Sequence, residues 1–290
     1  MANLIDIRRR IRSVKNTQQI TKAMKMVAAA RLRRAQDRIL ATRPYALEIK
    51  KVIANLAAHA AGRLKHPLLE VRPEERVLLI VVTGDKGLAG SFNANVLRRA
   101  VESIPRLKSV ELLLLGSKGV AFFRRRPLKV RKGYTTLFSN VTYAQAEEIA
   151  ADLREAYATG AYDAVHVIYN KFKSIISQEL TEERLLPIPA GEGAAAETAA
   201  GGQTREYLFE PSAEEILEEL LPRYVTFQVY RILLESQAAE HAARMTASDS
   251  ATKNAGEIID RLTLRYNRAR QAAITTELIE VVSGANALEG

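Results

Sequence analysis

Two long stretches at the ends of this 290-residue sequence carry a seven-residue apolar repeat and few residues that break helices. From Leu4 to Leu56 there is no glycine and one proline, Pro44. Alternate steps of four and three from Leu4 give sixteen positions, of which twelve are apolar. A stripe sustained over about eight heptads is typical of a coiled coil, because helices in ordinary globular cores run about 8 to 20 residues. We therefore predict a long helix over 1–60, bent or frayed at Pro44.

Three polar residues interrupt the middle of this stripe: Gln18, Thr21 and Lys25. Three apolar residues lie beside it at the same level: Ile20, Met24 and Val27. We interpret this shift as a place where the helix turns a different face toward a different neighbour.

The C-terminal stretch, 211–290, shows the same repeat. Steps of four and three connect a run of small and apolar residues: Ala255, Ile259, Leu262, Tyr266, Ala269 and Ala273. Ser212 and Glu215 form a capping-box pattern ahead of a short helix over 214–221, and Pro222 is expected to separate that helix from the long one. Neither long helix can bury its stripe alone, so we predict that the two pair as an antiparallel coiled coil.

The last turns of the sequence end the second long helix in an apolar tip, which comprises Ile274, Leu278, Val281 and Val282, with Ile279 beside them. We expect these residues to leave little polar face, so the tip should be buried. Because no other part of this chain is evidently available to cover the tip, we expect a second molecule to do so.

Between the two helical stretches, residues 70–210 show the sequence pattern of an α/β domain. Apolar runs of strand length lie at 76–83, 110–115 and 163–169, and helical patterns lie at 93–103 and 143–159. This alternation favours a parallel sheet with crossover helices, so we expect a Rossmann-like domain. Two further runs are candidate edge strands, 178–186 and 205–209, and the Ala/Gly-rich stretch 190–203 is a predicted mobile loop. The predicted fold class is α/β plus coiled coil, with domains at 1–60, 70–210 and 211–290.

The net charge of +10 is concentrated at the N-terminal end, because residues 1–60 carry +11, residues 61–210 carry +3 and residues 211–290 carry −4. Such asymmetry indicates an acidic partner, which could be nucleic acid, an anionic membrane or an acidic protein surface. A solvated helix face is the simpler alternative. We find no membrane-spanning run and no secretory signal, so we expect the protein in the cytoplasm.

The sequence offers no set of residues suited to catalysis. The absence of cysteine excludes disulfides, thiolate nucleophiles and Cys-ligated metals. The Gly-rich turn GDKGLAGSFN, 84–93, lacks the spacing of a P-loop or a dinucleotide fingerprint, so a structural turn is the favoured interpretation over a nucleotide site. The four histidines lack zinc spacing, and the triplets Arg8–Arg10 and Arg124–Arg126 lack the interleaved aromatic residues of a nucleic-acid site. We therefore expect no cofactor, no metal and no catalytic residue.

The amino-acid sequence at both ends resembles that of the gamma subunit of the F-type ATP synthase, bacterial type. IRRRIRSVKNTQQITKAMKMVAAARLRRAQ, 7–36, looks like the N-terminal helix of that family, and HAARMTASDSATKNAGEIIDRLTLRYNRARQAAITTELIEVVSGANAL, 241–288, looks like its C-terminal signature. The turn GDKGLAGSFNAN looks like its loop after the first strand. Ala89 stands where many relatives carry a cysteine, and the dithiol insert of chloroplast relatives is missing, so thiol control of that type is excluded.

The resemblance implies a mechanical role without catalysis by this chain. In the family, the coiled coil is the central rotor shaft inside a ring of three alpha and three beta subunits, and the α/β domain couples to epsilon and the membrane c-ring. Proton flow turns the shaft, and the shaft's asymmetric faces bias the nucleotide-binding conformations of beta. The implied place is the cytoplasmic side of the bacterial inner membrane, peripheral to it through the complex, with no direct small-molecule substrate.

The family's torque-transmitting contacts match particular positions of this sequence. Those near the top of the shaft are Arg270, Gln271 and Thr275, with Arg244 lower on the same helix, and those near the acidic loop of beta are Met24, Lys22 and Lys25. The apolar tip is expected to sit in a bearing. Two alternatives from other classes stay open at this point: a basic coiled coil that binds nucleic acid, and a stand-alone enzyme that binds nucleotide in 70–210.

Overall fold

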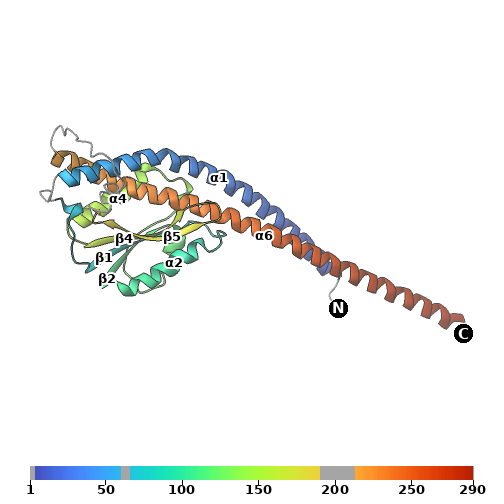
Figure 1. Ribbon diagram of the computed structural model, residues 1–290. Helices are drawn as coiled ribbons and strands as arrows, with labels where there is room; N and C mark the ends of the chain where they lie inside the picture. Colours follow the sequence, from blue (N-terminus) through green and yellow to red (C-terminus); the bar gives the residue numbers. More distant parts are fainter. Residues whose placement is uncertain (1–3, 60–65, 190–212, 290) are drawn as a thin grey trace. The chain divides into compact units, whose positions relative to one another are not determined.

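The computed structural model describes residues 4–59, 66–189 and 213–289. The chain forms two compact units, a terminal unit of Met1–Ala28 with Arg244–Gly290 and a central unit of Ala29–Ala243. The two long helices α1 (Leu4–His59) and α6 (Ala213–Glu289) contribute residues to both units (Figure 1). The expected loop at 190–203, the edge strand at 205–209 and Ser212 lie outside the described residues.

The helical pattern of both ends is confirmed, but neither proline ends a helix. Pro44 lies inside α1, and Pro222 lies inside α6. The predicted break at Pro222 is therefore wrong. Leu217, Leu221 and Val225 are buried on both sides of it, at 1% exposure or less. Burying each such side chain stabilises by about 1.5–3 kcal/mol, which outweighs the cost of about 3 kcal/mol for a proline within a helix.

The central unit contains one five-stranded sheet in the order β3-β2-β1-β4-β5. Its strands are β1 (Arg76–Val82), β2 (Ser109–Leu115), β3 (Val130–Tyr134), β4 (Ala164–Phe172) and β5 (Gln178–Leu186). The first four are parallel, and β5 is an antiparallel edge strand beside β4. In this order β2 and β3 lie on one side of β1, and the chain then crosses to the other side to form β4, which confirms the Rossmann-like prediction.

Helices cover both faces of the sheet, as Figure 1 shows for α2 and α4. The α-helices of the central part are α2 (Phe92–Ser103), α3 (Ser117–Phe123) and α4 (Tyr143–Ala158), and the 3-10 turns are η1 (Pro67–Leu69), η2 (Ile104–Arg106) and η3 (Leu137–Ser139). Every residue of β1 from Val77 to Val82 is at most 2% exposed, because the strand is covered on both sides. One of the two faces packs Leu79, Val81 and Leu112 against α2.

Two elements of the central unit, β3 and α3, were not predicted, for different reasons. The strand β3 (VRKGY) lies at the sheet edge with four exposed residues, so it lacks an apolar signature. The helix α3 has only seven residues and contains Gly119, which would disfavour a helix by propensity alone. Glycine fits there because α3 packs closely on Thr83: a Cβ at position 119 would stand 3.0 Å from the Thr83 hydroxyl oxygen, which would have to move.

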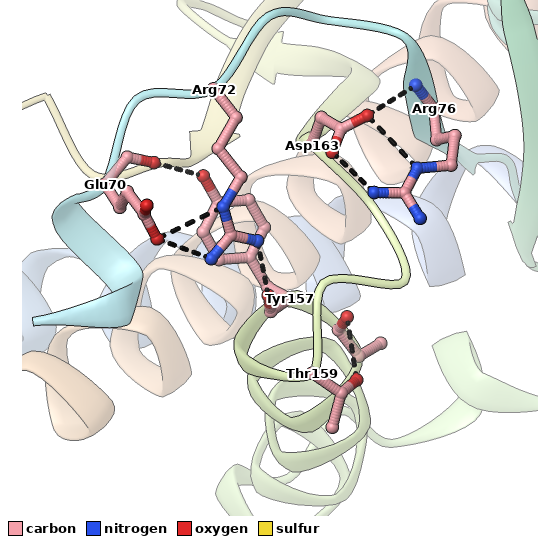
Figure 2. A network of polar contacts seen from close by, with 7 residues as sticks. Glu70, Arg72, Arg76, Tyr157, Thr159 and Asp163 are labelled. Carbon is pink, nitrogen blue, oxygen red and sulfur yellow. Dashed lines mark hydrogen bonds and ion pairs between the residues drawn. The ribbon is translucent and has the colours of Figure 1, made fainter.

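A polar network attaches the segment before β1 to the end of α4 and the start of β4 (Figure 2). Arg72 donates to the Glu70 carboxylate at 2.6 Å and to the Tyr157 carbonyl at 3.0 Å. The Asp163 carboxylate accepts from the backbone N–H and the guanidinium of Arg76, each at 2.8 Å. These hydrogen bonds lower the pKa of Asp163 below its ordinary value. Because they join residues distant in sequence, they fix where β1 enters the sheet.

Candidate functional site

The terminal unit is a pair of antiparallel helices with a regular seam. Contacts join Arg8 to Tyr266, Gln18 and Thr21 to Thr252, and Lys25 to Asp249, and the residue numbers of each pair add to between 270 and 274. The sum is nearly constant because one helix runs up while the other runs down. The predicted stripe is confirmed in this unit, since Leu4, Ile7, Ile11, Val14 and Ala28 are buried or half-buried there.

The polar interruption of the stripe lies in the seam itself. The Lys25 ammonium donates to Asp249 at 2.6 Å, and the Thr252 hydroxyl donates to that of Thr21 at 2.8 Å. The Gln18 amide reaches the Thr252 carbonyl at 3.5 Å. We call these five residues the polar layer.

The interpretation that the helix turns a different face to a different neighbour here is therefore wrong. The same face continues, and polar partners on α6 meet the polar residues of α1. Ile20 and Val27 are exposed, at 60% and 53%, beside this seam.

Asp249 is the acidic centre of the polar layer. One carboxylate oxygen accepts from Lys25, and the other accepts from Lys253 on its own helix at 3.2 Å. The hydrogen bond from Lys25, followed by that from Lys253, lowers the pKa of Asp249 below its ordinary value. Asp249 is therefore ionised at neutral pH and forms ion pairs with two lysines.

The upper group of predicted contact residues is exposed. Arg270, Gln271 and Thr275 all lie on the solvent-facing part of α6. The Thr275 hydroxyl donates to the Gln271 carbonyl at 2.9 Å, a bond within the helix. Gln271 and Thr275 are four residues apart and share one face. The structure thus brings these two together and leaves their outer surfaces open.

The lower group is more varied. Lys22 is exposed, whereas Met24 and Arg244 are half-buried. Lys25 is 44% exposed along its side chain, and its ammonium is held by Asp249. The exposed apolar residues Ile20, Met26 and Val27 lie near Lys22 in sequence; we noted Ile20 and Val27 beside the seam but named none of the three as a torque contact. Their signal was available, because apolar residues outside the seam of a coiled coil have no place in the pair itself.

The apolar tip of α6 is exposed. Its residues are Ile274 at 48%, Leu278 at 60%, Ile279 at 60%, Val281 at 69% and Val282 at 57%. Leu278, Ile279 and Val282 help to line a shallow apolar groove of about 250 Å³. By the pair numbering, Leu4 lies level with about Ala269, so the tip extends beyond the described part of α1.

The polar face of the tip is wider than we expected. At about 100° per residue, the five apolar side chains span about 160° of the helix circumference, and Glu277 and Glu280 point to the other side. The tip therefore has an apolar half and an acidic half.

The Gly-rich turn 84–93 is a structural turn in the central unit. The Asn93 side chain accepts from the Gly84 backbone at 2.8 Å and donates to the Lys86 carbonyl at 3.3 Å, which closes the turn. A Cβ on Gly84 would stand 2.8 Å from the Glu240 carboxyl group, so glycine leaves room for the Glu240 side chain of α6 here. An acidic side chain beside the turn disfavours a phosphate, so the geometry gives no support to a nucleotide site.

Asp85 in the same turn holds three loops together. Its carboxylate accepts from the backbone N–H of Ser117 at 2.9 Å, of Thr136 at 3.0 Å and of Phe138 at 2.8 Å, and also from the Ser117 hydroxyl. Sequence reasoning did not single out Asp85, because its three partners lie 32 to 53 residues away. With all these acceptor positions used, Asp85 is suited to holding the turn rather than to acid or base chemistry.

A second feature that we did not predict attaches α6 to the sheet. The Arg231 guanidinium donates to Glu183 at 2.6 Å, to the Tyr169 hydroxyl at 3.1 Å and to Glu235 at 3.3 Å. Burial alone would lower the pKa of Arg231, but the hydroxyl and the two carboxylates outweigh burial and raise it above its ordinary value. Burial also raises the pKa of Tyr169. Arg231 therefore stays charged and links α6 to β4 and β5.

Within 4–59, 66–189 and 213–289, no three His, Asp or Glu side chains come together as metal ligands would. In the same parts of the chain, no helix is long and apolar enough to cross a membrane.

The whole chain matches proteins of one kind. The family model described as ATP synthase matches residues 3–288. The ATP synthase gamma chain of Anaeromyxobacter sp. (strain Fw109-5) is 51% identical, and that of Desulforamulus reducens is 49% identical, each with 100% of both chains covered. Nothing in these matches supports the nucleic-acid alternative.

Solved structures agree with the fold. A chain from the central stalk and c-ring of the Tetrahymena thermophila mitochondrial ATP synthase is 30% identical, with a TM-score of 0.59, and covers 80% of this chain and 99% of its own. A chain from the rotor of the Euglena gracilis mitochondrial ATP synthase has a TM-score of 0.68 at 20% identity, with 93% and 98% covered, which shows the fold alone. With about half of its residues identical to curated gamma chains over their full length, this chain belongs to the family of ATP synthase gamma chains.

Proposed function

We propose that this chain is the central rotor shaft of a proton-translocating ATP synthase and couples proton-driven rotation to the conformational cycle of the catalytic beta subunits. The observation that carries the proposal is the exposed apolar tip on a helix of a gamma chain. An apolar surface of this kind calls for a partner that covers it. A ring of three alpha and three beta subunits offers an enclosing bearing.

The proposed mechanism is mechanical, and this chain supplies no catalytic residue. A shaft that presents different faces to the beta subunits shifts their conformations only through different contact free energies with each conformation. The tip has an apolar half and an acidic half, so its rotation changes what each beta subunit meets. The α/β domain over 70–210 would contact epsilon and the c-ring below, and the complex would place this chain on the cytoplasmic side of the bacterial inner membrane, peripheral to it.

Two groups of side chains are proposed to transmit torque. The upper group is Arg270, Gln271 and Thr275, whose exposed surfaces are free to bind the ring. The lower group is Lys22, Met24, Lys25 and Arg244, of which Lys22 has the most open side chain for an acidic loop of beta. Arginine is enriched among interface residues whose removal costs about 2 kcal/mol or more. Arg270 is therefore the residue whose loss should matter most.

The test is reconstitution with the organism's alpha and beta subunits, with co-elution and ATP hydrolysis as readouts. We expect this chain to join the complex and to stimulate hydrolysis. Arg270→Ala with Gln271→Ala should lower hydrolysis and coupling without lowering assembly. Arg265→Ala is the matched control, because Arg265 is exposed on the same helix and outside the proposed groups. Failure to co-elute or to change the rate would remove the rotor assignment for these partners.

A further inference from the structure

We propose that the polar layer of the terminal unit fixes the register of its two helices, with Lys25 and Asp249 as the positioning pair. The layer comprises Gln18, Thr21 and Lys25 on α1 and Asp249 and Thr252 on α6. The inference rests on the proposed function, because it assigns Lys25 a role inside the shaft beside any contact with a partner.

The apolar part of the seam is poorly suited to fixing register. Its members on α6 include the small residues Ala255 and Ala269, which offer little shape to distinguish one heptad from the next. Apolar side chains on α1 would find apolar neighbours after a shift of seven residues as well. A directional contact is needed to select one register, and a polar residue in a coiled-coil seam is known to do this at some cost in stability.

The polar layer supplies that selection. In the observed register, Lys25 meets Asp249 and Thr21 meets Thr252. A slip of one heptad would place Lys25 level with Ala242 or Gly256, and Thr21 level with Met245 or Ile259. In neither slipped register is the residue level with the lysine a carboxylate or the residue level with the threonine a hydroxyl. Each slip therefore takes these half-buried polar groups away from the partners that they have in the observed register.

Lys25 differs from its neighbour Lys22 in the same helix turn. The Lys25 ammonium lies 2.6 Å from Asp249, which lies across the seam and 224 residues away in sequence. Lys22 is exposed and is not one of the seam positions of α1. A lysine that serves only an acidic partner would have no need of an internal carboxylate. Lys22 is therefore the matched control for Lys25, with the same charge and nearly the same height on the helix.

The first measurement is the distance between two spin labels in the full chain, assembled with alpha and beta. The natural sequence has no cysteine, so Asn16→Cys and Asn267→Cys place labels at exposed positions on the two helices without competing thiols. One heptad of slip moves one helix along the other by about 10 Å, at 1.5 Å per residue. We expect Lys25→Glu to broaden the distance distribution or to add a population shifted by up to about 10 Å. Asp249→Lys should do the same, whereas Lys22→Glu should leave the distribution narrow.

The charge exchange decides between an internal and an external role. Lys25→Glu with Asp249→Lys rebuilds the pair with opposite polarity, so the double variant should recover the narrow distribution and most of the lost hydrolysis. If Lys25 acted only on an acidic partner, Asp249→Lys would restore neither. Thr21→Val with Thr252→Val is a second test that changes no charge, and it should also broaden the distribution.

Two results would overturn the proposal. One is an unchanged distribution in both Lys25→Glu and the double valine variant. The other is a charge exchange that behaves no better than its single variants. Failure of the proposed function would give a different result. Hydrolysis would then be insensitive to Lys22→Glu and to the Arg270 variants, while the distance between the labels would still respond to Lys25→Glu.

Discussion

Replacement of Arg231 by methionine should destabilise the central unit strongly. Arg231 lies between Tyr169, Glu183 and Glu235, and its side chain is only 22% exposed. Methionine keeps most of the apolar stem but removes the charge and all the donors. Two carboxylates and a buried hydroxyl are then left around an uncharged side chain. The loss should weaken the attachment of α6 to β4 and β5.

The expected cost follows from what is left unpaired. Removing one partner of a buried ion pair costs about 3–5 kcal/mol, and the residual exposure of Arg231 places the value near the lower end. With a denaturant slope of about 3 kcal/mol per molar, a loss of about 3 kcal/mol lowers the urea midpoint by about 1 M. Adding Glu183→Gln should return about 1–3 kcal/mol, because the uncompensated carboxylate is then gone.

The assay is urea unfolding at pH 7, followed by far-ultraviolet circular dichroism and tyrosine fluorescence. The control is Arg223→Met on the same helix, whose partner Glu219 is 69% exposed. A surface pair of this i,i+4 kind contributes about 0.3–0.5 kcal/mol, so the control should hardly move the midpoint. Equal midpoints for the Arg231 and Arg223 variants would refute the view that Arg231 links α6 to the sheet. So would a Glu183→Gln addition that destabilises the protein further.

Three further predictions concern stability at acid pH, two glycines and the apolar tip. The pKa of Asp163 is lowered in the folded state, so its ionised form stabilises the protein above about pH 4, and this contribution fades as the pH falls through the lowered pKa. Asp163→Asn should therefore be less stable than the natural protein at pH 7, and the difference between their urea midpoints should narrow toward pH 2. A difference that stays constant with pH would contradict this prediction. Gly116→Ala should lower the free energy of unfolding by about 3 kcal/mol or more, because the φ of Gly116 is +105° and a Cβ would lie 2.0 Å from the Thr83 carbonyl oxygen. Gly284→Ala is the control: its Cβ meets nothing within 4 Å, so the change should be neutral or stabilising by up to about 1 kcal/mol. Similar thermal midpoints for the two variants would disprove the reasoning. Leu278→Ser with Val282→Ser should change stability by about 0.5 kcal/mol or less, because both side chains are exposed. The same double variant should reduce the self-association of the isolated chain, measured by sedimentation. Unchanged association would show that another surface causes it.

Periodicity predicted the long helices and their seam well, because a coiled coil repeats one local rule many times. The residues Ile7, Ala28 and Ala255 could each be assigned to the seam from spacing alone, and all three are buried. The parallel sheet was also predicted in outline, since buried parallel strands are nearly continuous apolar runs. Such features depend on the neighbours of a residue in the sequence, which is what a sequence shows.

The misread features depend on distant partners. Lys25 looked like an interruption because Asp249 lies 224 residues away. Pro222 looked like a helix end because the rule for proline is local, whereas the burial of Leu217 and Leu221 that overrides it is tertiary. Arg231 carried no signal at all in the sequence. Its three acidic or hydroxyl partners come from two strands and its own helix, so only the fold brings them together.

The positions of the polar layer and the tip follow from different demands on one pair of helices. The tip, from Ile274 onward, extends past the level of Leu4, so it can remain apolar only if a partner encloses it. The layer at Lys25 and Asp249 has the opposite problem, because an apolar seam there would be stable in more than one register. A shaft must turn as one body, and slip between its helices would absorb rotation without moving the tip. The charged pair is therefore expected where apolar packing alone would leave the register free, at a cost in stability that the buried residues on either side of it can offset.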